Sequence, residues 1–165
     1  MILSVDVGLK NLAVCKLQKT VHGVQIVMWK LLHMHSSSCE SIVEALDAEE
    51  SLLDDVTTLL IEKQMRNNYK MSFLAHAIEM YMYTRGLWMN MKTLRIVRCP
   101  ASERCKNAGY IKGNGTKAQE YKKRKLAAIE FTKKNISKDW LEFLESHKKQ
   151  DDLCDSFAQG FLFFK

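Results

Sequence analysis

The chain has 165 residues, a formal net charge of +6 and a hydrophobic content of 47%. This length predicts a single domain, residues 1–165, with one substantial core. No apolar run reaches the roughly 18 residues of a membrane span, and Met1 leads directly into a predicted strand, so we expect no membrane partner and no signal peptide.

The cysteines and the charge distribution indicate which class of protein this is and what kind of partner it binds. The five cysteines are scattered and form no CxxC pair, which argues against a zinc site and predicts reduced thiols in a cytoplasmic protein. Residues 40–62 contain eight acids and no lysine or arginine, whereas residues 92–138 contain fourteen lysines and arginines against three acids. Such segregation indicates that one face meets a polyanion.

Five strands are predicted from β-branched and apolar residues. Residues 2–7 form a nearly all-apolar run, typical of a strand buried on both faces. Further strands are predicted at 12–17 and 21–32, the second of which alternates between apolar and polar side chains. The remaining two strands are predicted at 56–61 and 94–97.

Helices are predicted where apolar residues recur every three to four positions. Ser36–Ser38 supply N-cap candidates for the first, and Gly86 is expected to stop the second as a C-terminal cap. A polar loop is expected between Pro100 and Gly115. The predicted helices span residues 39–53, 67–85, 116–135 and 138–145, followed by a final helix that opens at 151.

This order of elements predicts the topology of an α/β fold. Tight connections make the first three strands antiparallel, and right-handed crossovers place strands 56–61 and 94–97 parallel to strand 2–7. We therefore expect a five-stranded mixed sheet, with three antiparallel strands followed by two parallel ones, flanked by helices.

The final helix begins with crowded negative charge. Leu153, Phe157 and two later phenylalanines form a buried stripe, and Asp152 and Asp155 lie on the outward-facing side. Asp151 is expected to cap the helix start. Spacing does not decide whether Asp151 or Asp152 acts with Asp155, because both lie about one turn from it.

Two further acids are predicted to join this pair. Asp6 and Glu62 end neighbouring parallel strands, so their carboxylates should meet above one edge of the sheet. Together with Asp152 and Asp155 they form an oxygen-only cage, which suits two Mg²⁺ ions, with Mn²⁺ able to substitute. Gly8 lacks a side chain and would let a sugar-phosphate backbone approach.

Three motifs resemble those of Holliday-junction resolvases. They are Asp6-x-Gly8-x-x-Asn11-Leu12-Ala13, Ile61-Glu62-Lys63-Gln64, and Lys148-Lys149-x-Asp151-Asp152-Leu153-x-Asp155-Ser156. The resemblance is to the RuvC-like branch of the RNase H superfamily, specifically the poxvirus and yeast mitochondrial resolvases. It implies an RNase H-like nuclease domain and a homodimer that cuts a four-way DNA junction symmetrically.

The resemblance also implies roles for individual residues. Asp6, Glu62, Asp152 and Asp155 correspond to the catalytic, metal-binding acids, with Asp152 favoured over Asp151. The family uses a lysine before its last acids. Lys117, after a glycine-rich loop, and Lys125, on the inward face of the basic helix, both remain candidates. The expected DNA-binding residues are Gly8, Asn11, Lys63, Gln64, Arg66, Lys117, Lys122, Lys123, Arg124 and Lys125.

The sequence therefore predicts a Mg²⁺-dependent endodeoxyribonuclease that resolves four-way junctions in genome recombination and replication, in the host cytoplasm if the chain is viral. Two alternatives stay open. One is a ribonuclease-H-type nuclease acting on RNA–DNA hybrids, and the other is a non-catalytic junction-binding module. An ATPase-like domain is disfavoured, because 165 residues leave no room for the second half that such folds need.

Overall fold

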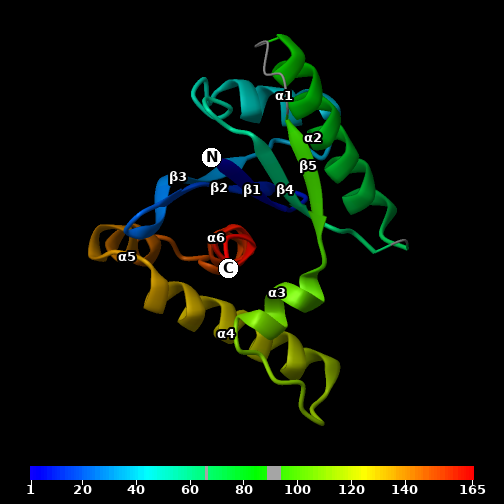
Figure 1. Ribbon diagram of the computed structural model, residues 1–165. Coiled ribbons are helices and arrows are strands. Elements are labelled where there is room, and N and C mark those ends of the chain that lie inside the picture. The colour runs from blue at the N-terminus through cyan, green and yellow to red at the C-terminus, as the bar shows by residue number, and fades with distance from the viewer. Residues whose placement is uncertain (66, 89–93) are drawn as a thin grey trace.

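A five-stranded mixed sheet forms the centre of the computed structural model, which describes residues 1–65, 67–88 and 94–165 (Figure 1). The strand order is β3-β2-β1-β4-β5. β1 pairs antiparallel with β2 and parallel with β4, so the predicted mixed topology is confirmed. The strands are β1 (Ile2–Val7), β2 (Asn11–Thr20), β3 (Gly23–His33), β4 (Thr58–Glu62) and β5 (Arg95–Cys99).

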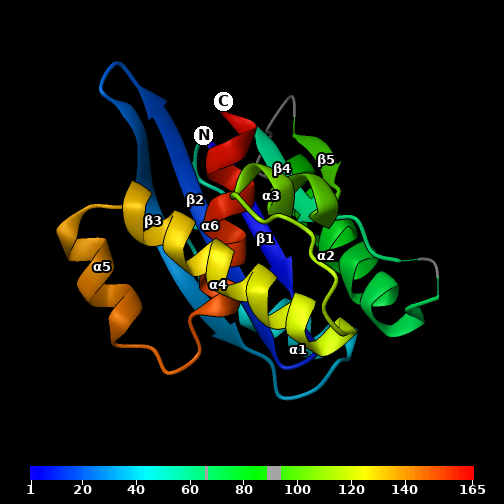
Figure 2. The ribbon, with the colours of Figure 1, turned by 90° about the horizontal axis from the view of Figure 1, so that it is seen from below.

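Helices cover both faces of the sheet. α1 and α2 lie on one face, and α6 crosses the other with α4 on its outer side (Figures 1 and 2). None of the described helices is long and apolar enough to cross a membrane. The helices are α1 (Cys39–Asp47), α2 (Tyr69–Trp88), α3 (Ala101–Asn107), α4 (Lys117–Asn135), α5 (Lys138–Glu145) and α6 (Asp151–Phe163).

The position of α6 against the sheet is fixed by close packing. Leu153 and Phe157 are buried against the strands, as the apolar stripe predicts. Gly160 brings the helix so near to β1 and β2 that an added Cβ would lie 2.3 Å from Leu17 Cδ1. The buried Gln159 amide donates to Ser4 Oγ of β1 at 3.1 Å. This contact fixes the C-terminal half of α6 against the middle of β1.

The first helix, the end of the second helix and the loop after Pro100 differ from the predictions. The first helix ends at Asp47 instead of residue 53, and Asp55 then turns the chain with a positive φ of 57°. Gly86 does not cap α2 but is buried within it, because packing outweighs the roughly 1 kcal/mol helical cost of glycine. The expected loop after Pro100 contains α3, whose first turn is closed by amides donating to the Pro100 carbonyl.

Candidate active site

Acids from three elements line one pocket at the carboxyl edge of the parallel strands. Val5 pairs with Ile61 across β1 and β4, which places Asp6 and Glu62 at the matching ends of the two strands. α6 brings Asp151, Asp152 and Asp155 to the same place. We call this hollow of about 230 Å³ the acid pocket; its lining also includes Arg104, Tyr121, Arg124 and Lys125.

Arg104 lies among three of these carboxylates. Its Nη2 is 2.8 Å from Glu62 Oε2 and 3.3 Å from Asp155 Oδ2, and its Nη1 is 3.6 Å from Asp6 Oδ1. The arginine side chain is only 9% exposed. No pattern in the sequence predicts Arg104 at this site, because the residue lies on α3, in a stretch where the sequence predicts a polar loop.

Burial and mutual repulsion raise the pKa values of the acids. Burial raises the pKa of Asp6 well above its ordinary value, Asp155 and Glu62 raise it further, and Arg104 opposes the shift. Burial likewise raises the pKa of Asp155 to about 6, with Arg104 lowering it and neighbouring acids raising it. Burial alone would lower the pKa of Arg104, but the surrounding carboxylates raise it, so the guanidinium stays charged.

The first turn of α6 holds two further ion pairs. Asp151 is buried and pairs with Lys125 of α4. The prediction that Asp151 caps the helix is therefore wrong. The N-cap position belongs to Gln150, which makes no side-chain capping bond. Asp152 accepts a hydrogen bond from Lys149 Nζ at 2.6 Å.

The two lysine candidates occupy different hollows. Lys125 lines the acid pocket, where its Nζ lies 4.7 Å from the centre of the Tyr121 ring and pairs with Asp151. Lys117 instead borders a neighbouring hollow of about 930 Å³, with Arg124 lining both. The structure therefore brings Lys125, and not Lys117, together with the acids.

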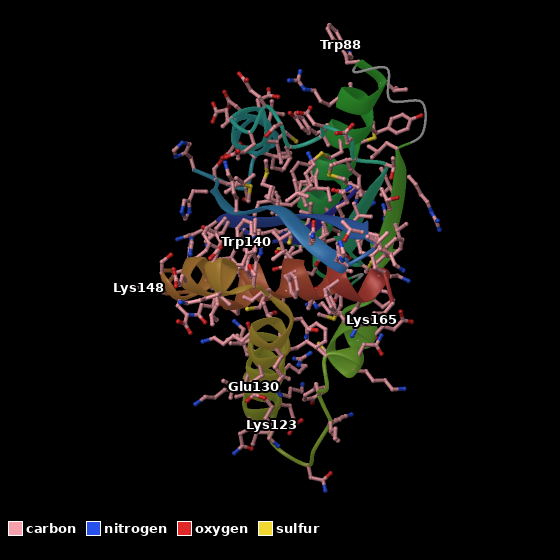
Figure 3. The ribbon with its side chains drawn as sticks, turned by 60° about the vertical axis from the view of Figure 1, so that its left-hand side comes forward. Trp88, Lys123, Glu130, Trp140, Lys148 and Lys165 are labelled. Atoms are coloured by element: carbon pink, nitrogen blue, oxygen red, sulfur yellow. The ribbon has the colours of Figure 1, made fainter. Side chains whose placement is uncertain are left out.

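The basic helix presents much of its charge to solvent. Lys122 and Arg124 are exposed on α4. Lys123 is also exposed and lies on the part of the helix that extends away from the sheet, with Glu130 further along (Figure 3). It pairs with Glu120 at 3.1 Å. This arrangement leaves an extended cationic surface beside the acid pocket.

Residues after β1 have structural partners of their own. A Cβ on Gly8 would lie 2.6 Å from the backbone oxygen of Asn11, so the tight turn itself requires glycine. The Asn11 side-chain oxygen lies 2.8 Å from His33 Nδ1, and Asn11 does not line the acid pocket.

The residues after β4 lie beside the pocket without lining it. The backbone amide of Lys63 donates to the Cys99 carbonyl at 2.8 Å, and the Lys63 side chain is exposed. Gln64 Nε2 donates to the Glu62 carbonyl at 3.2 Å. The prediction for Arg66 lies outside the described residues.

The chemistry of the acid pocket fits a hard cation. Its donors are carboxylate oxygens, the ligands that Mg²⁺ and Mn²⁺ prefer. In the described ranges, no three His, Cys, Asp or Glu side chains are arranged as a ready ligand group. The guanidinium of Arg104 lies between the acids instead, with buried Nε and Nη1 atoms that lack hydrogen-bond partners there. The pocket therefore already holds a cation, the guanidinium of Arg104, whose hydrogen-bond donors are only partly used.

Comparisons with known proteins agree on the fold and the family. A family model described as Poxvirus A22 protein matches residues 1–164, which confirms the predicted resemblance to a poxvirus family. A relative from Acanthamoeba polyphaga mimivirus, described as uncharacterized protein L451, is 29% identical over 116 residues. That alignment covers 64% of this chain and only 28% of the mimivirus protein.

Solved structures of resolvases share the fold. The fowlpox virus resolvase, in a complex with Holliday-junction DNA, superposes with a TM-score of 0.68 and 18% identity, covering 98% of this chain and 95% of that one. The yeast mitochondrial resolvase Ydc2 gives 0.60 and 14%, covering 96% and 75%. RuvC of T. thermophilus, also in a junction complex, gives 0.57 and 12%, covering 97% and 90%. The predicted fold class is thereby confirmed.

Proposed function

Since the chain belongs to the Poxvirus A22 protein family, we propose that it is a DNA endonuclease that resolves four-way junctions during genome recombination and replication. The observation that carries this proposal is the convergence of Asp6, Glu62, Asp152 and Asp155 in one pocket beside a basic helix. The junction complexes of similarly folded resolvases support the choice of substrate. We place the activity in the host cytoplasm, as the resemblance to poxvirus resolvases implies.

We propose that these four acids hold divalent cations, specifically two Mg²⁺ ions, for which Mn²⁺ can substitute. When bound, such ions stabilise charge on the phosphodiester and activate a water. The protein supplies the oxygen ligands from three rigid elements, β1, β4 and α6. Lys125, held by Asp151, contributes a fixed positive charge to the same pocket.

We propose that α4 and the adjacent large hollow bind the DNA backbone. Lys122, Lys123 and Arg124 are exposed on α4, and Lys117 and Lys112 border the hollow. Such contacts recognise phosphates without reading bases, so binding should fall steeply as the salt concentration rises. Preference for a four-way junction would then come from the geometry of the backbone path.

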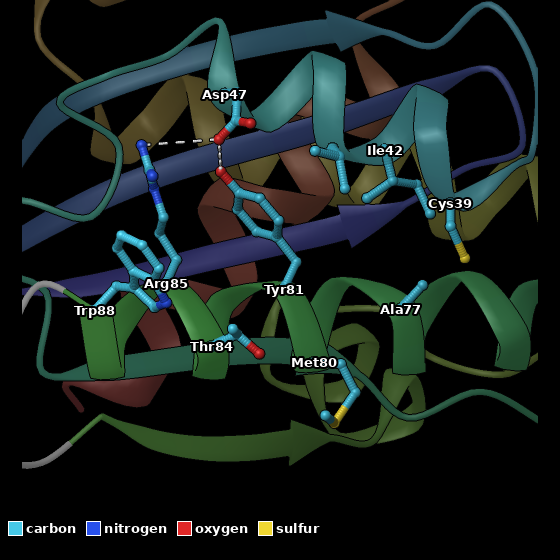
Figure 4. A pocket seen from close by; sticks show the side chains of 10 residues that line it. Cys39, Ile42, Asp47, Ala77, Met80, Tyr81, Thr84, Arg85 and Trp88 are labelled. Carbon is cyan, nitrogen blue, oxygen red and sulfur yellow. Dashed lines mark hydrogen bonds and ion pairs between the residues drawn. The ribbon is translucent and has the colours of Figure 1, made fainter.

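Symmetric cleavage of two strands requires two active sites, so we propose a homodimer. The surface between α1 and α2 supports this because it exposes apolar side chains around a pocket of about 470 Å³ (Figure 4). Met80 and Trp88 line this pocket and are 62% and 84% exposed. Leu87 and Phe73 add further exposed apolar surface to α2. A second copy would bury this face.

Sedimentation equilibrium tests the dimer. The wild-type chain should sediment as a dimer, and Met80→Glu should shift it to a monomer because a carboxylate would be buried at the interface. Val21→Glu is the matched control, since Val21 is 95% exposed at the β2–β3 turn and far from α2 in the chain. A monomeric wild type would contradict the proposal, as would an unchanged dimer in the Met80 variant.

Cleavage of a synthetic four-way junction tests the activity. With each strand labelled in turn, Mg²⁺ should yield paired nicks at symmetric positions on two opposed strands. Asp152→Asn should reduce cleavage by at least 100-fold while junction binding survives, because only a ligand oxygen is altered. Asp139→Asn, an exposed position on α5, is the control and should cleave normally.

Each alternative function has its own outcome in this assay. Faster cleavage of an RNA–DNA hybrid than of the junction would identify a ribonuclease-H-type enzyme. Junction binding without cleavage in either Mg²⁺ or Mn²⁺ would identify a binding module. Normal cleavage by Asp152→Asn would show that the proposed ligand assignment is wrong.

A further inference from the structure

A buried arginine balances part of the negative charge in the acid pocket. Arg104 reaches in from α3, which packs against α6 and α4. Its guanidinium is within ion-pair distance of Asp6, Glu62 and Asp155, at 3.6, 2.8 and 3.3 Å. The other two acids have their own partners, because Asp151 pairs with Lys125 and Asp152 with Lys149. Arg104 is therefore the cation shared by the three remaining carboxylates.

The guanidinium is held by charge more than by a hydrogen-bond fit. Arginine offers five N–H donors in a planar fork, and a well-built site satisfies most of them. Here Nε and Nη1 are buried without a hydrogen-bond partner in the described part of the chain. The distance of 3.6 Å from Nη1 to Asp6 Oδ1 is too long for a hydrogen bond. Burying unsatisfied donors costs free energy, so this position is favourable only while the carboxylates lack a better cation.

A divalent cation would need the same oxygens. The atoms that face the guanidinium are Oδ1 of Asp6, Oε2 of Glu62 and Oδ2 of Asp155, all from proposed metal ligands. A guanidinium and a metal ion both carry positive charge and repel strongly at a few ångströms in a partly buried pocket. The two cations therefore cannot both occupy this position.

We propose that Arg104 is a displaceable internal counter-ion: it neutralises the acid pocket in the metal-free protein and leaves the three carboxylates when a divalent cation binds. This inference rests on the metal site of the proposed function. Exchange makes metal binding weaker than the bare carboxylates would allow, because each binding event must first break the arginine contacts. It also protects the fold from the repulsion of three unpaired acids while no metal is present.

Metal binding to Arg104→Gln tests the exchange directly. Without the arginine, calorimetry should give a Mn²⁺ dissociation constant about 10- to 100-fold lower than wild type, because the metal no longer competes with the ion pairs to three carboxylates. In EDTA the variant should melt at a lower temperature than wild type, because its acids are uncompensated. Saturating Mn²⁺ should close that gap.

Arg98→Gln is the matched control. Arg98 of β5 pairs with Glu79 of α2 at 2.5 Å, and neither residue lines the acid pocket. The loss of Arg98 should therefore leave the Mn²⁺ dissociation constant unchanged. A purely structural role for Arg104 would lower the melting temperature equally with and without Mn²⁺ and leave the dissociation constant equal or higher. That result would overturn the exchange.

The wild-type protein offers a second readout that does not depend on folding of the variant. The Arg104 Nε–H signal in nitrogen–proton NMR spectra should shift and exchange faster with water when Mg²⁺ is added. An unchanged signal in a protein that binds Mg²⁺ would overturn the exchange while leaving the metal site intact. Failure of the wild type to bind either ion at millimolar concentration would instead overturn the proposed metal site, and the inference with it.

Discussion

Replacing Asp155 with asparagine should stabilise the metal-free protein at neutral pH. The pKa of Asp155 is raised from 3.8 to about 6, mainly by burial, with Arg104 lowering it and other acids raising it. A folded pKa above the unfolded pKa means that the folded state binds the proton more tightly. Stability is therefore lost as the pH rises from about 4 through about 6. At pH 7 the cost approaches about 3 kcal/mol, from about two pKa units at 1.36 kcal/mol each.

Asparagine has nearly the same shape and no charge, so it removes this cost. Urea unfolding in EDTA should show Asp155→Asn more stable than wild type by about 2–3 kcal/mol at pH 7 and by less than about 1 kcal/mol at pH 4. Asp139→Asn, at an exposed position, controls for the loss of a carboxylate. Lower stability of Asp155→Asn than of wild type at pH 7, or an advantage that grows as the pH falls, would show that the buried carboxylate does not destabilise the fold. Adding Mg²⁺ should stabilise wild type and do less for the variant.

Two further predictions concern the framework around the site. Gly160→Ala would place a Cβ 2.3 Å from Leu17 Cδ1 and 3.1 Å from Ser4 Cβ. Urea unfolding should therefore show a free energy of unfolding lower by about 1–3 kcal/mol. Equal or greater stability would mean that α6 can move away from the sheet. Glu120 accepts hydrogen bonds from Tyr110 Oη and from two glycine amides in the loop before α4. Glu120→Gln should speed amide hydrogen exchange across residues 109–116, whereas unchanged rates would show that the carboxylate does not order this loop.

The sheet and two of its acids could be predicted because local patterns determine them. The nearly all-apolar run at 2–7 and the run before Glu62 each specify a buried strand, and the order of elements makes these strands parallel neighbours. Since parallel strands end at the same edge, Asp6 and Glu62 are brought together by topology alone. No side-chain contact had to be known to place them in one pocket.

The partners of the acids could not be predicted in the same way. Arg104 lies on a seven-residue helix with too few turns for an apolar stripe, within a basic stretch that indicates phosphate binding as readily as an internal ion pair. The sequence predicts Lys125 on the inward face of its helix, where an unpaired lysine is costly. The structure supplies Asp151 as its partner from 26 residues away, a contact that depends on how α4 crosses α6. The same crossing explains why Asp151 is not a cap.

The ion pairs of the acid pocket differ in how easily a metal could break them. Lys149 is 55% exposed, so its pair with Asp152 is screened by water and contributes about 1 kcal/mol or less. Arg104 is 9% exposed and pairs with three acids at once, so its release leaves three partly buried carboxylates and a buried guanidinium without partners. An ion entering the acid pocket would thus displace Lys149 at little cost and Arg104 at a substantial one. For this reason the affinity for metal should depend on residue 104 far more than on residue 149, although both are cations beside the same carboxylates.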